Sequence, residues 1–86
     1  FLFIAQIKKI VTIMTALYSI KKGSTVVVKQ LPVGTNKIQM IRIGITEGQM
    51  VFCLERLPGG TIIVQKNRQE IAIGADLAKQ IVVEQV

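Results

Sequence analysis

Short runs of Ile and Val, divided by glycine, proline and other turn residues, constrain the fold of this chain more than any other feature. Branched side chains favour extended backbone, and the turn residues limit each strand to a few residues. The chain has 86 residues, which suits one domain with one core. Because closing a sheet on itself removes exposed strand edges, the sequence predicts a single small β-barrel, an all-β fold.

The expected strands follow from the turn signals. Pro32 ends the first strand because it cannot donate to a ladder, and Pro-Gly-Gly at 58–60 makes the next hairpin. Asn67 tolerates positive φ and predicts a tight two-residue loop. A helical turn around 76–79, capped by Asp76, precedes the last strand. The five expected strands occupy residues 25–31, 49–57, 61–66, 69–74 and 81–86.

One short helix is expected around residues 37–43. Asn36 is a favourable N-cap residue, and Gly44 can supply the left-handed residue that ends a helix. In a Schellman ending, Ile45 then packs back on Met40. The sequence therefore predicts that the helix stops at Gly44.

The charge balance permits several partners. Eleven Lys and Arg residues against five Asp and Glu residues give a net charge of +6, which allows contact with nucleic acid, an acidic membrane surface or an acidic protein. The basic residues are spread along the chain, and no aromatic residues interleave with them as a stacking platform requires. A solvated basic surface is therefore favoured over nucleic-acid binding, which stays an alternative.

Residues that support catalysis or metal binding are few. The chain has no His, which excludes His-based acid–base catalysis and His-based metal sites. Cys53 stands alone in an apolar strand, so we expect it to pack in the core. The sequence thus predicts no enzyme, no cofactor and no metal site, with five solvated carboxylates in separate elements: Glu47, Glu55, Glu70, Asp76 and Glu84.

Residues 1–13 form an apolar extension that Lys8 and Lys9 interrupt, so it is too short to span a membrane. We expect Met14 to be the natural start and the extension to be non-native. The alternative is that the extension contacts a neighbouring chain or the barrel. In that case, residues 1–17 would join copies of the chain into a homo-oligomer. If this region were helical, the apolar stripe that could pair with another chain (the helical seam) would contain Phe3, Ile7, Ile10, Met14 and Leu17.

Three stretches of residues 17–86 carry a family resemblance: "LYSIKKGSTVVV", "IRIGITEGQMVFCLERLPGG" and "NRQEIAIGADLAKQIVV". In this order they resemble the FeoA family, small cytoplasmic proteins of bacterial ferrous iron uptake. The resemblance implies an SH3-like barrel over residues 14–86 that works by binding rather than by catalysis. It also implies a partner, the membrane iron transporter FeoB with its cytosolic GTPase domain, which would recruit the chain to the inner face of the membrane.

The expected partner-binding residues lie on the short helix and in the loop before it. Methionine adapts to a partner groove and arginine pairs with carboxylates, whereas Ile38 is expected to plug the barrel. A metal-sensing or corepressor-like module of an iron-dependent regulator, with transition metal ion binding, is the alternative. The residues expected to contact the partner are Lys37, Met40, Ile41, Arg42, Leu31 and Val33.

Overall fold

The structure is a computed structural model, and it describes residues 14–86. The expectations for residues 1–13 lie outside this range. Along the described chain, the elements are β1 (Met14–Ala16), the 3-10 helix η1 (Leu17–Ser19), β2 (Thr25–Gln30), α2 (Thr35–Arg42), β3 (Met50–Arg56), β4 (Ile62–Lys66), β5 (Gln69–Ile73), α3 (Ala75–Ala78) and β6 (Val82–Gln85).

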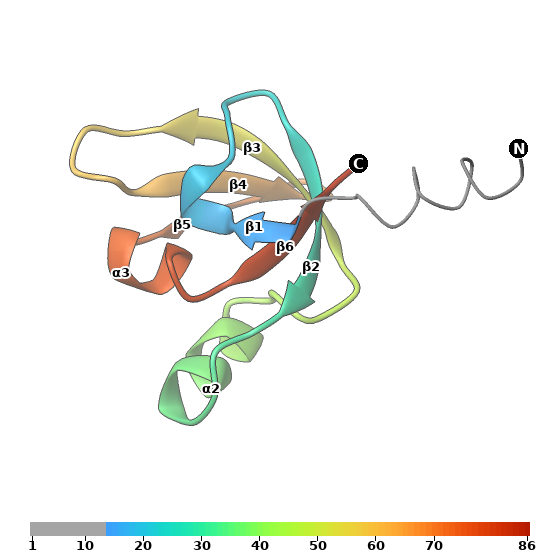
Figure 1. Cartoon of the computed structure of the whole chain (residues 1–86), viewed down its shortest axis with the longest axis vertical. Coiled ribbons are helices and arrows are strands. Elements are labelled where there is room, and N and C mark those ends of the chain that lie inside the picture. Colours follow the sequence, from blue (N-terminus) through green and yellow to red (C-terminus); the bar gives the residue numbers. More distant parts are fainter. Residues whose placement is uncertain (1–13) are drawn as a thin grey trace, which may run out of the picture.

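Within residues 14–86, six strands form one antiparallel sheet in the order β1-β6-β2-β3-β4-β5. The register of β2 against β6 shifts between Val28 and Gln30, and that of β3 against β4 shifts between Cys53 and Glu55. Such irregularities bend a strand and increase its twist. The bent sheet curls around one core (Figure 1), which confirms the expected small barrel.

Alternation along the strands builds the core. In β2, Val26 and Val28 are buried, whereas Val27 between them is partly exposed. Strands β3, β4 and β5 show the same inward and outward alternation, as a half-buried sheet requires. The core contains Leu17, Ile20, Val26, Val28, Leu31, Met40, Ile45, Val51, Cys53, Ile62, Val64, Ile71, Ile73, Ala78, Ile81 and Val83.

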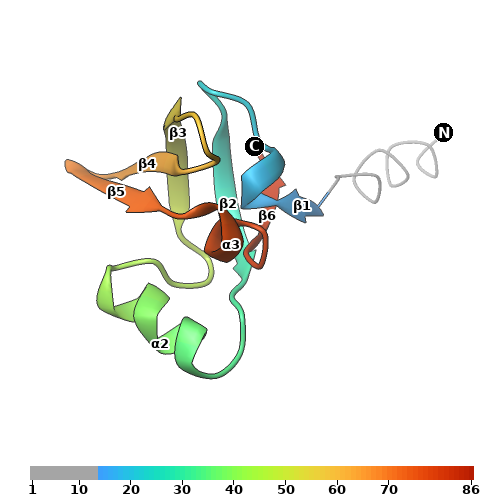
Figure 2. The ribbon, with the colours of Figure 1, turned by 90° about the vertical axis from the view of Figure 1, so that its left-hand side faces the viewer.

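Two short helices lie between β1 and β5, the ends of the strand order (Figure 2). η1 and α3 contact each other, and each buries one residue, Leu17 and Ala78 respectively. The backbone N–H of Leu17 also donates to the Ile81 carbonyl at 2.8 Å. The apolar core is therefore completed by helical side chains at this side of the barrel.

Gly60, in the turn between β3 and β4, lies against these helices. Its φ is +97°, and an added Cβ would be 2.8 Å from the Ala75 Cβ and 2.9 Å from the Tyr18 Cε1. Gly59 has a similar φ of +93°, but an added Cβ would meet nothing within 4 Å. Both positions need glycine for the backbone, and only Gly60 also needs it for space.

We expect Gly60→Ala to lower the free energy of unfolding by about 2.5 kcal/mol, because backbone strain and overpacking act together. The matched variant Gly59→Ala has only the strain and is expected to lose about 1 kcal/mol. Urea denaturation of both variants measures the difference. Equal losses would show that the Tyr18 and Ala75 side chains move aside freely.

The first two elements were not expected. The helical seam is wrong for its two described members, because Met14 lies in β1 and Leu17 lies in η1. A strand as short as β1 shows no periodicity, and it forms by pairing with β6, where Met14 faces Glu84. Asp76 is also not the cap of α3: Gly74 holds the N-cap position, and Asp76 lies in the first turn.

Candidate functional site

Helix α2 extends from one end of the barrel, joined to β2 and β3 by loops (Figures 1 and 2). It has eight residues, and Met40 is its one buried residue. Isolated helices of this length are marginal in water, so tertiary contacts must hold α2 in place. A helix with one buried side chain offers most of its surface to a partner.

The helix ends as the sequence predicted. Gly44 has a φ of +95°, and its backbone N–H donates to the Ile41 carbonyl at 3.0 Å. The N–H of Ile45 donates to the Met40 carbonyl at 2.9 Å, which completes the hydrogen-bond pattern of a Schellman motif. Ile45 and Met40 are both buried in the core, so this predicted packing is confirmed.

The helix start differs from the expectation. Gly34 holds the N-cap position, the helix begins at Thr35, and no side chain caps it. Asn36 instead donates from its Nδ2 atom to the Gln80 Oε1 atom at 3.1 Å. The Asn36 side chain therefore joins the start of α2 to the residues after α3, which a local capping pattern could not reveal.

Two basic side chains flank two isoleucines on the solvent side of α2. Successive helical residues are rotated by about 100°, so Lys37, Ile41, Ile38 and Arg42 fall in that order within an arc of about 140°. All four are exposed, with Ile38 at 53% and Ile41 at 48%. Met40 lies about 160° from Ile38, toward the core. We call these four exposed residues the α2 surface.

Three of the residue placements expected from the sequence are wrong. Met40 and Leu31, expected to contact a partner, are 0% and 5% exposed because both pack in the core. Ile38, expected to plug the barrel, is instead exposed. The two errors on the helix have one cause: α2 turns Met40 inward, and this rotation carries Ile38 to the solvent side. Val33, in the loop before α2, is 85% exposed.

The α2 surface carries no acidic residue. Among residues 14–86, ion pairs join Lys22 to Glu55 and Lys29 to Glu84, and neither pair involves the helix. Lys37 and Arg42 therefore place two positive charges at the edges of an exposed isoleucine pair. This arrangement suits a partner with an apolar contact and nearby carboxylates.

A lysine from the sheet holds the C-terminal end of α2. The Lys66 Nζ atom, at the end of β4, donates to the Gly44 carbonyl at 2.7 Å. A cation at this position also interacts favourably with the helix dipole. Sequence reasoning missed this contact because Lys66 lies in a different element, beside a hairpin loop whose residues gave only a turn signal.

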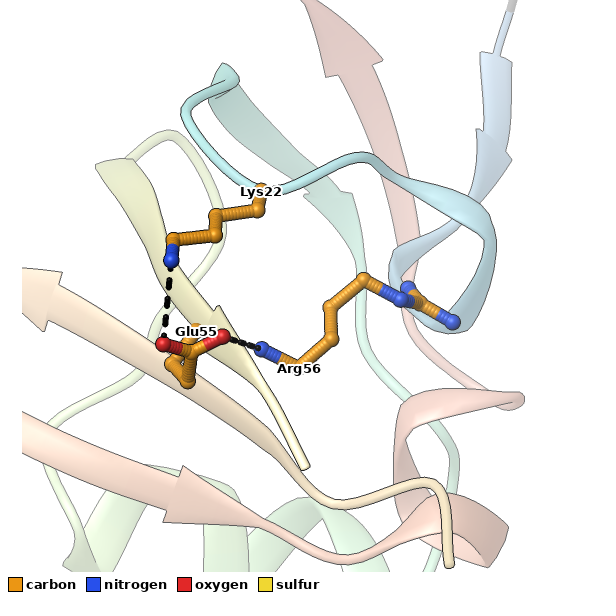
Figure 3. Close-up of polar contacts among 3 residues, drawn as sticks. All are labelled: Lys22, Glu55 and Arg56. Atoms are coloured by element: carbon orange, nitrogen blue, oxygen red, sulfur yellow. Dashed lines mark hydrogen bonds and ion pairs between the residues drawn. The ribbon is translucent and has the colours of Figure 1, made fainter. Parts of the chain in front are cut away.

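A second polar cluster joins β3 to the η1–β2 region (Figure 3). Glu55 accepts from Lys22 at 3.1 Å and from the Arg56 backbone N–H at 3.2 Å. The hydrogen bond from Lys22, then the one from the Arg56 backbone, lowers the pKa of Glu55 below its usual value. The Arg56 guanidinium donates to the Tyr18 and Ile20 carbonyls, both at 2.6 Å. These contacts join elements of the barrel, so we assign this cluster to stability.

Cys53 packs in the core, as expected. Its exposed fraction is 0%, and burial, the largest influence, raises the pKa of its thiol despite the lowering effect of Arg56. A thiol in this state is a weak nucleophile at neutral pH. Within residues 14–86, no three Cys, Asp or Glu side chains come together as metal ligands, and no helix is long and apolar enough to cross a membrane.

Solved structures resemble this fold. The crystal structure of an iron uptake regulatory protein (FeoA) matches with a TM-score of 0.78 and 24% identity, over 86% of this chain and 99% of that one. The FeoA-like protein from Clostridium acetobutylicum matches with a TM-score of 0.76 and 21% identity, over 85% of this chain and 87% of that one. A manganese-dependent transcriptional repressor matches with a TM-score of 0.78 and 21% identity, over 85% of this chain and 42% of that one.

These likenesses confirm the SH3-like barrel, the fold that the sequence predicted. No curated protein matches the chain. The model of the FeoA domain family matches residues 15–85, which is most of the sequence and all of the described residues except the first and the last. On the strength of that match, this chain belongs to the FeoA domain family.

Proposed function

We propose that this chain is a non-catalytic adaptor or regulator of bacterial ferrous iron uptake, and that it binds the cytosolic part of the FeoB transporter. Membership of the FeoA domain family implies involvement in ferrous iron transport. A cytoplasmic location at the inner face of the membrane follows from this partner.

The α2 surface carries the proposal. Ile38 and Ile41 are exposed, although the core takes only Met40 from this helix. The exposed parts of these isoleucines add little to the stability of the free chain, whereas a partner that removes them from water makes the free energy of binding more favourable. Lys37 and Arg42 at the edges would add attraction to carboxylates and set the register of the complex.

The double variant Ile38→Ala and Ile41→Ala tests the proposal. We expect it to bind the purified cytosolic domain of FeoB at least about 30-fold more weakly than the unchanged chain, because central apolar contacts dominate binding energy. Alanine is the best helix former, so the substitutions leave α2 intact. Isothermal titration calorimetry measures the affinities.

The control truncates two exposed apolar side chains elsewhere. Met14 in β1 and Met50 in β3 are each 58% exposed, so Met14→Ala with Met50→Ala removes comparable surface from the sheet. This control is expected to bind FeoB normally. Equal affinity for both double variants, with the barrel folded, would reject the α2 surface, and no binding by the unchanged chain would reject the partner.

A further inference from the structure

Helix α2 has few contacts that hold it against the barrel. Its one buried residue is Met40, and its start is joined to the rest of the chain by an exposed hydrogen bond between Asn36 and Gln80. Burying one side chain stabilises such a helix only slightly more than the loss of conformational entropy on ordering its eight residues destabilises it. Any further contact at its other end therefore has a large influence on how rigidly the α2 surface is presented.

Lys66 supplies that contact. Its ammonium group donates to the Gly44 carbonyl at 2.7 Å, at a partly buried site. The same part of the chain lies beside Gly44: an added Cβ there would be in ordinary van der Waals contact, 3.5 Å from the Lys66 Nζ atom and 3.9 Å from the Gln69 Oε1 atom. The β4–β5 hairpin thus meets the helix end directly, and a charged donor makes the stronger kind of hydrogen bond.

We infer that Lys66 is a positioning residue: it holds α2 in the orientation that binds the partner, without touching the partner itself. This inference rests on the proposed function. Gly44 holds the left-handed position, and its carbonyl belongs to the same peptide group as the Ile45 N–H that completes the Schellman motif. By binding it, Lys66 couples the hairpin to the turn from which Ile41 and Arg42 project.

The physical reason is preorganisation. A helix that is already ordered loses less conformational entropy when it docks, so its affinity is higher for the same contacts. If α2 loosens, only the ordered fraction of the chain is competent to bind, and the apparent affinity falls by that fraction. The residue that controls order in α2 therefore controls affinity from a distance.

The first measurement is amide hydrogen exchange of the full chain without a partner. In Lys66→Met, we expect the amides of Ile43, Gly44 and Ile45 to exchange about tenfold faster, because one charge-assisted hydrogen bond no longer holds the helix end. Amides of the β2–β3 ladder should keep their protection. Lys66→Arg retains a cationic donor and is expected to restore slow exchange.

The second measurement is affinity for the purified cytosolic domain of FeoB. Lys66→Met is expected to bind severalfold to about tenfold more weakly, and Lys66→Arg to recover most of the loss. The control Lys21→Met removes the same charge from an exposed loop position and should change neither exchange nor affinity.

The outcomes are distinct. Unchanged exchange at the helix end in Lys66→Met, or equally faster exchange throughout the barrel, would overturn the positioning role. Faster exchange at α2 with unchanged affinity would overturn its link to binding. Absence of binding by the unchanged chain would overturn the proposed function, while the exchange result would still decide whether Lys66 holds the helix.

Discussion

Met40→Ala is expected to lower the free energy of unfolding by about 3 kcal/mol, the cost typical of truncating a buried methionine. The Met40 side chain is 0% exposed and belongs to the core cluster with Ile45. Its loss leaves a cavity where the one buried side chain of α2 packs on the barrel. Urea denaturation followed by circular dichroism measures the change.

Ile38→Ala is the matched control on the same helix. It also truncates a large apolar side chain, but that side chain is 53% exposed, so we expect a change within about 0.5 kcal/mol. Opposite results, with Ile38→Ala the more destabilising variant, would show that the helix is rotated from the orientation described. The comparison therefore tests the placement on which the α2 surface depends.

Arg56→Met is expected to lower the free energy of unfolding by about 3 kcal/mol, because two hydrogen bonds from a charged donor disappear together. The Arg56 Nη1 atom donates to the Tyr18 and Ile20 carbonyls, and its guanidinium lies 5.5 Å from the centre of the Tyr18 ring. Methionine keeps the apolar stem and leaves both carbonyls without this donor. Thermal and urea denaturation measure the loss.

Lys22→Met is the control for charge in the same cluster. Lys22 pairs with Glu55 at 3.1 Å, but both side chains are well exposed, at 64% and 45%. Exposed ion pairs contribute little, so we expect a change within about 0.5 kcal/mol. An equally small loss of stability in both variants would contradict this expectation. It would show that water hydrates the Tyr18 and Ile20 carbonyls when Arg56 is replaced.

The local parts of the fold were readable from the sequence because their causes are local. Gly44 ends the helix since left-handed backbone strongly favours glycine, and its φ of +95° confirms this. Asn67, with a φ of +56°, forms the predicted hairpin loop for a related reason. In each case, the residue that dictates the geometry lies within the element itself.

The orientation of α2 was not readable in this way. Apolar residues at 38, 40 and 41 spread over an arc of about 160° around a short helix, so their spacing fits an inward Ile38 as well as an inward Met40. The choice depends on contacts from distant elements, namely Lys66 with Gly44 and Gln80 with Asn36. The candidate site therefore kept Lys37, Ile41 and Arg42, gained Ile38, and lost Met40 and Leu31.

By itself, the sequence determined a small barrel of β-branched strands, the glycine that ends its helix, and a core position for Cys53. These follow from backbone conformation and from alternation, which act over a few residues. Only the tertiary structure decided the pairing of β1 with β6, the closing role of η1 and α3, and which side of α2 meets solvent. Those features depend on contacts between residues far apart in the chain. The free energies of such contacts cannot be inferred from a local sequence pattern.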